Sequence, residues 1–219
     1  MDSRLISPII ISIKVAIPSI ILTFFVGVLM AYMVYKLKSR WLQSLLDGIF
    51  NLPLVLPPTV AGFFLLEIFG VKGIIGKFFL EFFGIKIAFS FWACVLAAVI
   101  IAFPLMYRSS LAAFRQMDKN IIFAAKTLGL SERKIFFKIV LPTCKHGIMT
   151  GGILSFTRGL GEFGATTMIA GNIINKTRTI SLAIYSEVIG GNMARASFYV
   201  WILVIIAILA ILLMNKVEN

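Results

Sequence analysis

Several long apolar stretches constrain this chain more than any other feature of its sequence. The first runs from about Ile9 to Tyr35, and the last from about Phe198 to Met214. A helix needs about 20 apolar residues to cross a bilayer whose hydrocarbon core is about 30 Å thick. Among the 219 residues, 60% are hydrophobic and only 14% are charged, whereas about a quarter of a soluble domain is charged. We therefore expect a multi-pass helical membrane protein.

Three further apolar stretches lie between these two, at about Gly48–Phe69, Ile87–Tyr107 and His146–Gly161. The expected fold class is therefore all-α, a polytopic transmembrane helix bundle with about five spans. Residues 1–219 form a single transmembrane domain in this interpretation. The N-terminus lacks a small-residue cleavage site after a short apolar core, so it is interpreted as the first span and not as a removed signal peptide.

The second apolar stretch contains three prolines, Pro53, Pro57 and Pro58. Proline removes a backbone donor and clashes with the preceding helical turn, so this stretch must kink or break. In lipid, such a break is tolerated only against protein or a water-filled cavity. We therefore expect the second stretch to pack toward the interior of the bundle.

A short segment after the second stretch has the pattern of an interfacial helix. Its apolar residues recur four apart, whereas Lys77 and Glu81 lie away from the apolar stripe. The segment is too short to span a bilayer, and we expect it to lie on the membrane surface.

Basic residues gather in short loops between the apolar stretches. The formal net charge is +12, but no basic surface interleaved with aromatic residues is visible, so no nucleic acid is expected as a partner. The basic loops at 36–40 and 108–138 fit the cytoplasmic side, where lysine and arginine are in excess. This placement puts the N-terminus outside and the C-terminus, with Lys216, in the cytoplasm.

Residues typical of catalytic or metal sites are sparse. Cys94 and Cys144 belong to different membrane depths, so no disulfide is expected, and their spacing fits no metal site. The single histidine, His146, is interpreted as an interface or packing residue, with a proton relay as the alternative. Gly73–Phe78 resembles a phosphate-binding loop but has the wrong spacing and no hydroxyl after the lysine. No catalytic residue, metal or cofactor is therefore expected on this chain.

One basic, amphipathic segment, Asn120–Pro142, interrupts the apolar stretches. Gly129 lies near its middle and supplies the left-handed residue that ends a helix at low cost. Ser131 can cap a second helix, with Glu132 favourably placed in its first turn. The final proline disfavours helical geometry in Leu141, which marks the entry to the next span. The segment therefore predicts two helices joined by a turn.

Each of these two predicted helices carries its own apolar face. The apolar residues at helical spacing are Ile121, Ala125 and Leu128 in the first, and Ile135, Phe136 and Ile139 in the second. Two interpretations remain open. The segment can be an amphipathic loop lying on anionic lipid, or a rigid helix pair that docks in a groove of a cytoplasmic partner and transmits displacement.

The spacing within this segment resembles the EAA loop of ABC importer permeases, whose signature is Glu-Ala-Ala, three residues, Gly, nine residues and Ile-x-Leu-Pro. The Ala-Ala pair, the glycine and the Ile-x-Leu-Pro ending stand in register here, whereas Phe123 occupies the glutamate position. The resemblance implies that residues 119–138 form the coupling helices of a type I importer permease. The residues that it assigns to coupling are Ala124, Ala125, Leu128, Gly129, Ile139, Leu141 and Pro142.

The same resemblance implies the partners of the chain. They are a second copy in a homodimer, two ATP-binding ABC subunits at the cytoplasmic face, an extracytoplasmic oxyanion-binding protein, and membrane lipid. ATP and Mg would be bound by the partner ATPase, so the chain is a transport subunit and not an enzyme. Its expected location is the plasma (inner) membrane of a prokaryote.

The stretch Ser155–Ser186 resembles the corresponding region of molybdate/tungstate permeases, and "PLVLPPTVAGF" in the second apolar stretch points to the same group. The resemblance implies import of molybdate or tungstate, two ions of near-identical shape and charge. Sulfate/thiosulfate permeases share much of the "LGEFGA" pattern and are the nearest alternative. A passive channel or secondary transporter is less favoured, because it needs intramembrane ligands for a coupling ion and the chain has few buried acids.

Glycines interrupt the fourth apolar stretch near residues 159–164. Discontinuous helices mark the pathway in transporters, and charges at membrane depth usually face an interior cavity. Two residues spaced i, i+4 there can pair on one helical face. They form either a structural pair that holds the break or part of a gate on the oxyanion route. The candidate pathway residues are Arg158, Gly161, Glu162, Phe163 and Gly164.

Overall fold

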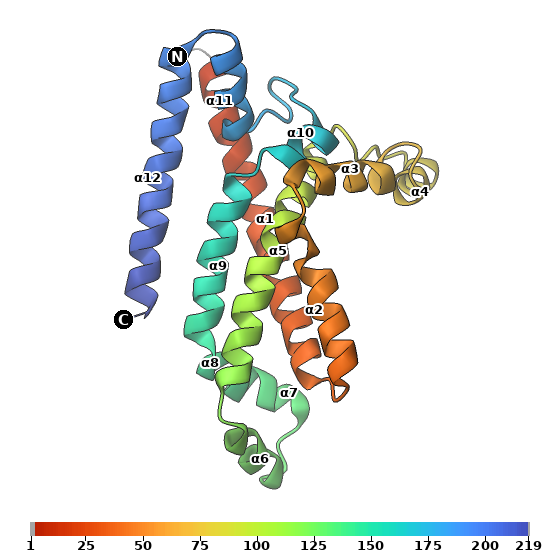
Figure 1. Cartoon of the computed structure of the whole chain (residues 1–219), viewed down its shortest axis with the longest axis vertical. Coiled ribbons are helices and arrows are strands. Elements are labelled where there is room, and N and C mark those ends of the chain that lie inside the picture. The colour runs from red at the N-terminus through yellow and green to blue at the C-terminus, as the bar shows by residue number, and fades with distance from the viewer. Residues whose placement is uncertain (1–2, 219) are drawn as a thin grey trace.

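The computed structural model describes residues 3–218, which form helices and connecting loops without a β-strand (Figure 1). This confirms the all-α prediction. In chain order the elements are α1 (Ser3–Lys36), α2 (Arg40–Val55), α3 (Pro58–Phe69), α4 (Ile74–Phe83), α5 (Phe91–Gln116), α6 (Lys119–Thr127), α7 (Glu132–Ile135), the π-helical turn η1 (Phe136–Val140), α8 (Leu141–Thr143), α9 (Lys145–Leu160), α10 (Gly164–Ala170), α11 (Ile180–Ile189) and α12 (Met193–Glu218).

Three helices, α1, α5 and α9, run side by side and form the centre of the bundle (Figure 1). The α5 face toward its neighbours is rich in small residues, with Ala93, Ala97, Ala98 and Ala102 all buried. Small side chains let helix backbones approach closely, which is how membrane helices gain packing energy without a hydrophobic driving force between them. On either side of this centre, α2 packs on α5, and α12 packs on α9 and α11.

Each of the five predicted apolar stretches contains helix, but the helices differ in length. Within residues 3–218, α1, α5 and α12 are long and apolar enough to cross a bilayer, and the α2–α3 pair adds a fourth crossing if it is one broken span. The fourth stretch, α9, has 16 residues and is about 24 Å long. It is therefore shorter than the hydrocarbon core of about 30 Å.

The third span differs from its predicted limits. It was expected at about Ile87–Tyr107, but α5 begins at Phe91 and continues to Gln116. Arg108 and Arg115 therefore lie on the end of a long helix and not in a loop. The helix continues because no proline or glycine follows Tyr107 until the chain turns at Met117.

The proline-rich second stretch breaks, as predicted. The axes of α2 and α3 differ by 111° across the break, where Leu56 and Pro57 are extended. Only α3 fulfils the expectation of interior packing, because it buries Ala61, Gly62 and Leu65, whereas no residue of α2 is fully buried. Within this chain α2 packs on α5 and leaves its remaining surface open.

The predicted interfacial segment forms α4, which projects sideways from the bundle together with α3 (Figure 1). Its phenylalanines stack along the helix, with ring centroids 4.7 Å apart for Phe78–Phe82 and 5.6 Å apart for Phe79–Phe83. Lys77 pairs with Glu81 at 3.6 Å on the other face. An apolar face with a charged back is the pattern of a helix that lies in the plane of a membrane surface.

Candidate functional site

The basic segment folds into a compact structure at one end of the bundle, which we call the elbow and define as residues 118–143 (Figure 1). Asp118 begins it by accepting a hydrogen bond from the Asn120 amide at 2.9 Å. At the other end of α6, Gly129 has φ +72°. The Leu130 amide donates to the Ala125 carbonyl at 3.1 Å, which is the closing bond of a Schellman motif. The predicted helix–turn–helix and the role of its glycine are thus confirmed.

Glu132 holds the second half of the elbow in place. Ser131 caps α7 by accepting from the Lys134 amide at 3.5 Å, as predicted. The Glu132 carboxylate then binds Lys36 of α1 at 2.6 Å and Lys126 of α6 at 2.9 Å. Hydrogen bonds from these two ammonium groups, that of Lys36 foremost, hold the pKa of Glu132 below its ordinary value. One carboxylate therefore joins both halves of the elbow to the first helix.

Aromatic packing makes the attachment of the elbow rigid. Ile135 and Val140 are fully buried, and the ring of Phe136 lies 4.4 Å from that of Tyr32 on α1. Tyr32 in turn contacts Phe114 near the end of α5, with ring centroids 5.7 Å apart. Packed cores move as units because they are dense and do not deform continuously.

The prediction that Leu141 leaves the helical conformation and marks the entry to the next span is wrong. Leu141 is helical, with φ −60° and ψ −48°, and its amide donates to the Phe136 carbonyl in the π-helical turn η1. Pro142 follows in the first turn of α8, where a missing amide hydrogen is tolerated. The wider turn accommodates the proline without an extended residue before it, and the chain bends only at Cys144, with φ −95° and ψ 8°.

The elbow exposes apolar side chains at its tip. The expected α6 stripe is divided: Ala125 is buried, but Leu128 is 79% exposed and Ile121 is exposed as well. Phe123, at the position of the motif glutamate, is 61% exposed. Phe137 of η1, in the second half of the elbow, is exposed as well. Of the other predicted coupling residues, Ile139 and Leu141 are half-buried, and Ala124, Gly129 and Pro142 are exposed. Exposed apolar clusters of this kind mark interaction sites.

The predicted pathway residues meet at a second place, the break between α9 and α10. Arg158 pairs with Glu162 at 2.7 Å, and the Glu162 side chain is only 2% exposed. The second oxygen of Glu162 accepts a hydrogen bond from the Ala165 amide at 2.8 Å, in the first turn of α10. The carboxylate thus satisfies a helix N-terminus that would otherwise be buried without a partner.

The glycines at this break serve a close contact between α10 and α3. A β-carbon on Gly62 would lie 2.7 Å from the Ala165 Cα, and one on Gly164 would lie 3.0 Å from the Pro58 Cβ. Phe163 stacks on Tyr185 with ring centroids 5.0 Å apart. The two helix breaks of the chain therefore face each other, and each covers the irregular backbone of the other, as a membrane interior requires.

A third cluster was missed by the sequence reasoning. Asp47 of α2 lies 3.6 Å from Arg115 of α5 and accepts a hydrogen bond from the Tyr107 hydroxyl. A cavity of about 590 Å³ lies beside this pair and is also lined by Arg108 and Asn51. The sequence did contain a signal for this cluster. Asp47 and Asn51 are one helical turn apart, and Arg108 and Arg115 are two turns apart, so each pair lies on one helix face. The sequence analysis assigned both arginines to a loop, so it did not predict that they share a helix face.

Within residues 3–218, no three histidine, cysteine, aspartate or glutamate side chains gather in a way that would hold a metal. Cys94 and Cys144 are buried as free thiols. The Nδ1 of His146 lies 2.7 Å from the Val217 carbonyl oxygen of α12, so this histidine packs against the last helix, which agrees with the packing interpretation.

A polytopic helical bundle with broken helices at its centre and a rigid elbow at one end defines the membrane permease subunit of a transporter. The profile of the family described as "binding-protein-dependent transport system inner membrane component" matches residues 23–217. The chain belongs to this family.

Relatives and solved structures agree with this assignment. The chain is 39% identical to the Bacillus subtilis (strain 168) protein YvgM over 98% of its own length and 94% of that protein. It is 37% identical to the molybdenum transport system permease protein ModB of Haemophilus influenzae, over 83% of this chain and 79% of that one.

Its fold is that of type I ABC importer permeases. A chain of the MetNI methionine ABC transporter superposes with TM-score 0.75 at 16% identity, covering 99% of this chain and 97% of that one. A chain of a bacterial alginate ABC transporter, solved in complex with its periplasmic protein, gives TM-score 0.70 at 14% identity, covering 99% and 78%.

Proposed function

We propose that this chain is the permease subunit of an ATP-driven importer that moves molybdate or tungstate into the cytoplasm. Two copies form the translocation unit, two ATP-binding subunits bind ATP and Mg at the cytoplasmic face, and an external protein delivers the oxyanion. The observation that carries the proposal is the elbow, which is fixed firmly to α1 and α5 yet exposes Leu128 and Phe123 at its tip.

The elbow suits the transmission of force better than adsorption to lipid. A segment that only lies on a membrane needs no rigid connection to the bundle, whereas Glu132 and Phe136 both join this one to α1. A partner that moves the tip therefore moves the ends of α1 and α5 as well. In this proposal the elbow lies in the cytoplasm, with the N-terminus outside and the C-terminus inside.

The chemistry of the chain leaves ATP binding to a partner. No phosphate-cradling loop is present in the sequence. The position of the motif glutamate holds Phe123, and Glu132 instead supplies an ion pair between the elbow halves.

The names of the relatives favour molybdate or tungstate as cargo, and sulfate or thiosulfate is the alternative. In this proposal the segment Gly161–Gly164 borders the oxyanion route. Arg158 is the group that can meet an anion there, because its side chain is 33% exposed whereas its partner Glu162 is buried. A charge-assisted hydrogen bond from a guanidinium suits a tetrahedral dianion.

The test is the variant Gly129→Val, with Gly84→Val as its matched control. Both glycines have positive φ, +72° and +65°, and a β-carbon at either meets nothing within 4 Å. A left-handed β-branched residue is strained by more than about 1–2 kcal/mol, so both variants weaken one helix end. Only Gly129→Val should abolish ATP-driven uptake and co-purification of the ATPase, while membrane insertion stays normal.

Normal ATP-driven uptake by Gly129→Val would overturn the coupling role of the elbow. Uptake by the reconstituted complex without ATP would favour a passive channel instead. Competition of unlabelled molybdate, tungstate and sulfate against labelled molybdate, measured with the binding protein present, would decide the cargo.

A further inference from the structure

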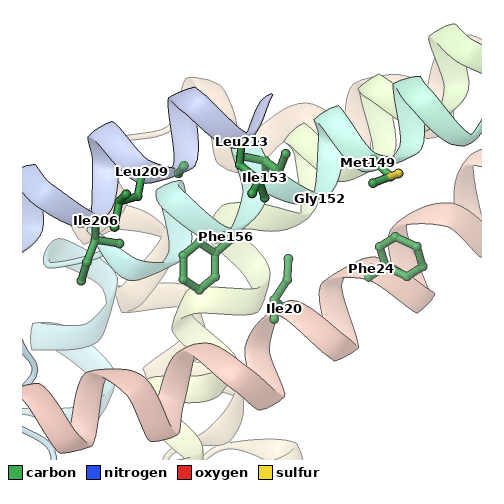
Figure 2. Close-up of a pocket in the computed structure, with 10 residues that line it drawn as sticks. Ile20, Phe24, Met149, Gly152, Ile153, Phe156, Ile206, Leu209 and Leu213 are labelled. Carbon is green, nitrogen blue, oxygen red and sulfur yellow. The ribbon is translucent and has the colours of Figure 1, made fainter. Parts of the chain in front are cut away.

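A further surface feature of the structure is an apolar groove outside the candidate sites described above. A groove of about 500 Å³ runs between α1, α9 and α12 (Figure 2). Its walls include Ile20 and Phe24 from α1, Met149 and Phe156 from α9, and Leu209 and Leu213 from α12. Every residue that lines it is apolar or glycine. Water in such a groove would find no hydrogen-bond partners.

The groove is a built cavity and not merely a gap between loosely packed helices. Gly152 forms part of its floor, where an added β-carbon would meet only the Phe24 ring, at 3.8 Å. His146 binds the Val217 carbonyl at 2.7 Å and thereby holds the end of α12 against the start of α9. The helix spacing at that end of the groove is therefore fixed. Elsewhere α12 is little covered, since only 11% of its apolar window is buried in the chain.

Positive charge lies at the same end of the groove. Lys145 is one helical turn before Met149 on α9, and Lys216 is one turn after Leu213 on α12. Residues three or four apart share a helix face, so both lysines continue the lines of groove-lining residues to the membrane surface. Both side chains are exposed. Lysines at this depth extend to the headgroup layer and attract anionic lipid.

We propose that this groove binds one acyl chain of an anionic phospholipid, with the phosphate of the headgroup between Lys145 and Lys216. The apolar walls take the chain, Gly152 leaves room for it, and the two ammonium groups select the headgroup charge. The bound lipid supplies packing that α12 lacks within the chain. The site does not depend on the proposed transport function; only its assignment to the cytoplasmic leaflet rests on the orientation given above.

The test uses the full chain in nanodiscs that contain equal amounts of phosphatidylglycerol and phosphatidylcholine. Lipid that stays bound after transfer to mild detergent is identified by native mass spectrometry. We expect retained phosphatidylglycerol, and a preference over phosphatidylcholine that falls about fivefold for each lysine changed in Lys145→Gln and Lys216→Gln, because each contributes independently to the attraction.

The groove itself is tested with Gly152→Phe, which fills it, against Leu154→Phe, which adds bulk to the exposed side of the same helix outside the groove. Gly152→Phe should lose the retained lipid, and Leu154→Phe should keep it. If Gly152→Phe does not yield folded protein, the two lysine variants still decide the matter, because their side chains lie at the surface.

An unchanged preference for phosphatidylglycerol in both lysine variants would overturn the proposal. So would any of three other results. The first is equal retention of both lipids by the unchanged chain, and the second is undiminished retention in Gly152→Phe. The third is a cross-link between two copies of Leu209→Cys in the membrane, which would show that the groove receives a helix of a second copy and not a lipid.

Discussion

The elbow and the paired helix breaks both depend on glycine, but they use it in opposite ways. At the elbow, Gly129 adopts a left-handed conformation in open space, and the side chain next to it, Leu128, is 79% exposed. At the breaks, Gly62 and Gly164 have ordinary backbone angles, but a β-carbon on Gly62 would overlap Ala165 and one on Gly164 would press against Pro58. The elbow tip leaves apolar side chains exposed, whereas the paired breaks are packed within the chain.

This difference predicts which substitutions affect association with a partner and which affect folding. The elbow tip makes few contacts within the chain, so changes there should leave folding intact and impair association. The breaks lie at the crossing of α3 and α10, where Gly62 and Gly164 bring the two helices close together, so changes there should impair folding first. The variants below test this separation, in order of decreasing expected effect.

The largest effect is expected for Gly62→Leu. Its β-carbon would collide with backbone atoms of Ala165, which cannot move aside as a flexible side chain can. We expect a loss of more than about 3 kcal/mol, at or beyond the upper end for overpacked cores, measured as the thermal unfolding midpoint in detergent. The matched control is Gly48→Leu on α2, where a β-carbon meets nothing within 4 Å. Equal midpoints for the two variants would show that the α3–α10 contact is not tight.

Glu162→Gln removes the charge that pairs with Arg158 but keeps an oxygen for the Ala165 amide. We expect a loss of about 2–3 kcal/mol in unfolding free energy, below the ~3–5 kcal/mol of a fully buried pair, because Arg158 is partly exposed.

The double variant Arg158→Gln/Glu162→Gln then distinguishes the two roles of the pair. Recovery of both stability and uptake would indicate a purely structural pair. Recovery of stability without uptake would indicate that the guanidinium meets the oxyanion.

Leu128→Ala should have the opposite profile. Surface substitutions usually change stability by less than about 0.5 kcal/mol, whereas truncation of a central apolar interface residue can cost about 2 kcal/mol of binding. We therefore expect an unchanged unfolding midpoint and roughly thirtyfold weaker binding of the ATPase subunit, measured by titration in nanodiscs. The control is Leu212→Ala, an exposed leucine of α12. Weakened binding in both variants would remove the special role of the elbow tip.

The smallest effect is expected from the ion pairs of Glu132. Since its pKa is lowered in the folded chain, its contribution is fully present above the unfolded pKa of about 4.5 and is lost as the pH falls through the lower folded value. Exposed pairs contribute about 0.2–1 kcal/mol. We expect the protection of amides in residues 119–140 against hydrogen exchange, taken relative to the intrinsic exchange rate at each pH, to fall below pH 4.5, and Glu132→Gln to remove this pH dependence. Persistence of the dependence in that variant would assign it to another group.

Local chemistry explains which features the sequence predicted. The turn at Gly129, the cap at Ser131 and the break at Pro57 each depend on residues within a few positions, and all three are present. The likeness to the EAA loop located the elbow for the same reason, because its spacing lies within one segment.

Features that depend on distant residues were not accessible in this way. The contact of Gly62 with Ala165 joins positions about 100 apart, and Asp47 reaches Arg115 only because α5 extends further than its apolar run. The π-helical turn before Pro142 was also missed, because a rule about single residues does not describe how five neighbours share the adjustment. Tertiary packing decided each of these cases.

The position of α9 has a mechanical consequence. It is a straight element bounded by a bend at Cys144, beside the elbow, and by its end at Gly161, beside the second break. Sixteen residues at 1.5 Å each make a rod of about 24 Å, whose far end shifts by about 0.4 Å for each degree of tilt. A few degrees of rocking at one pivot thus becomes an ångström or more at the other.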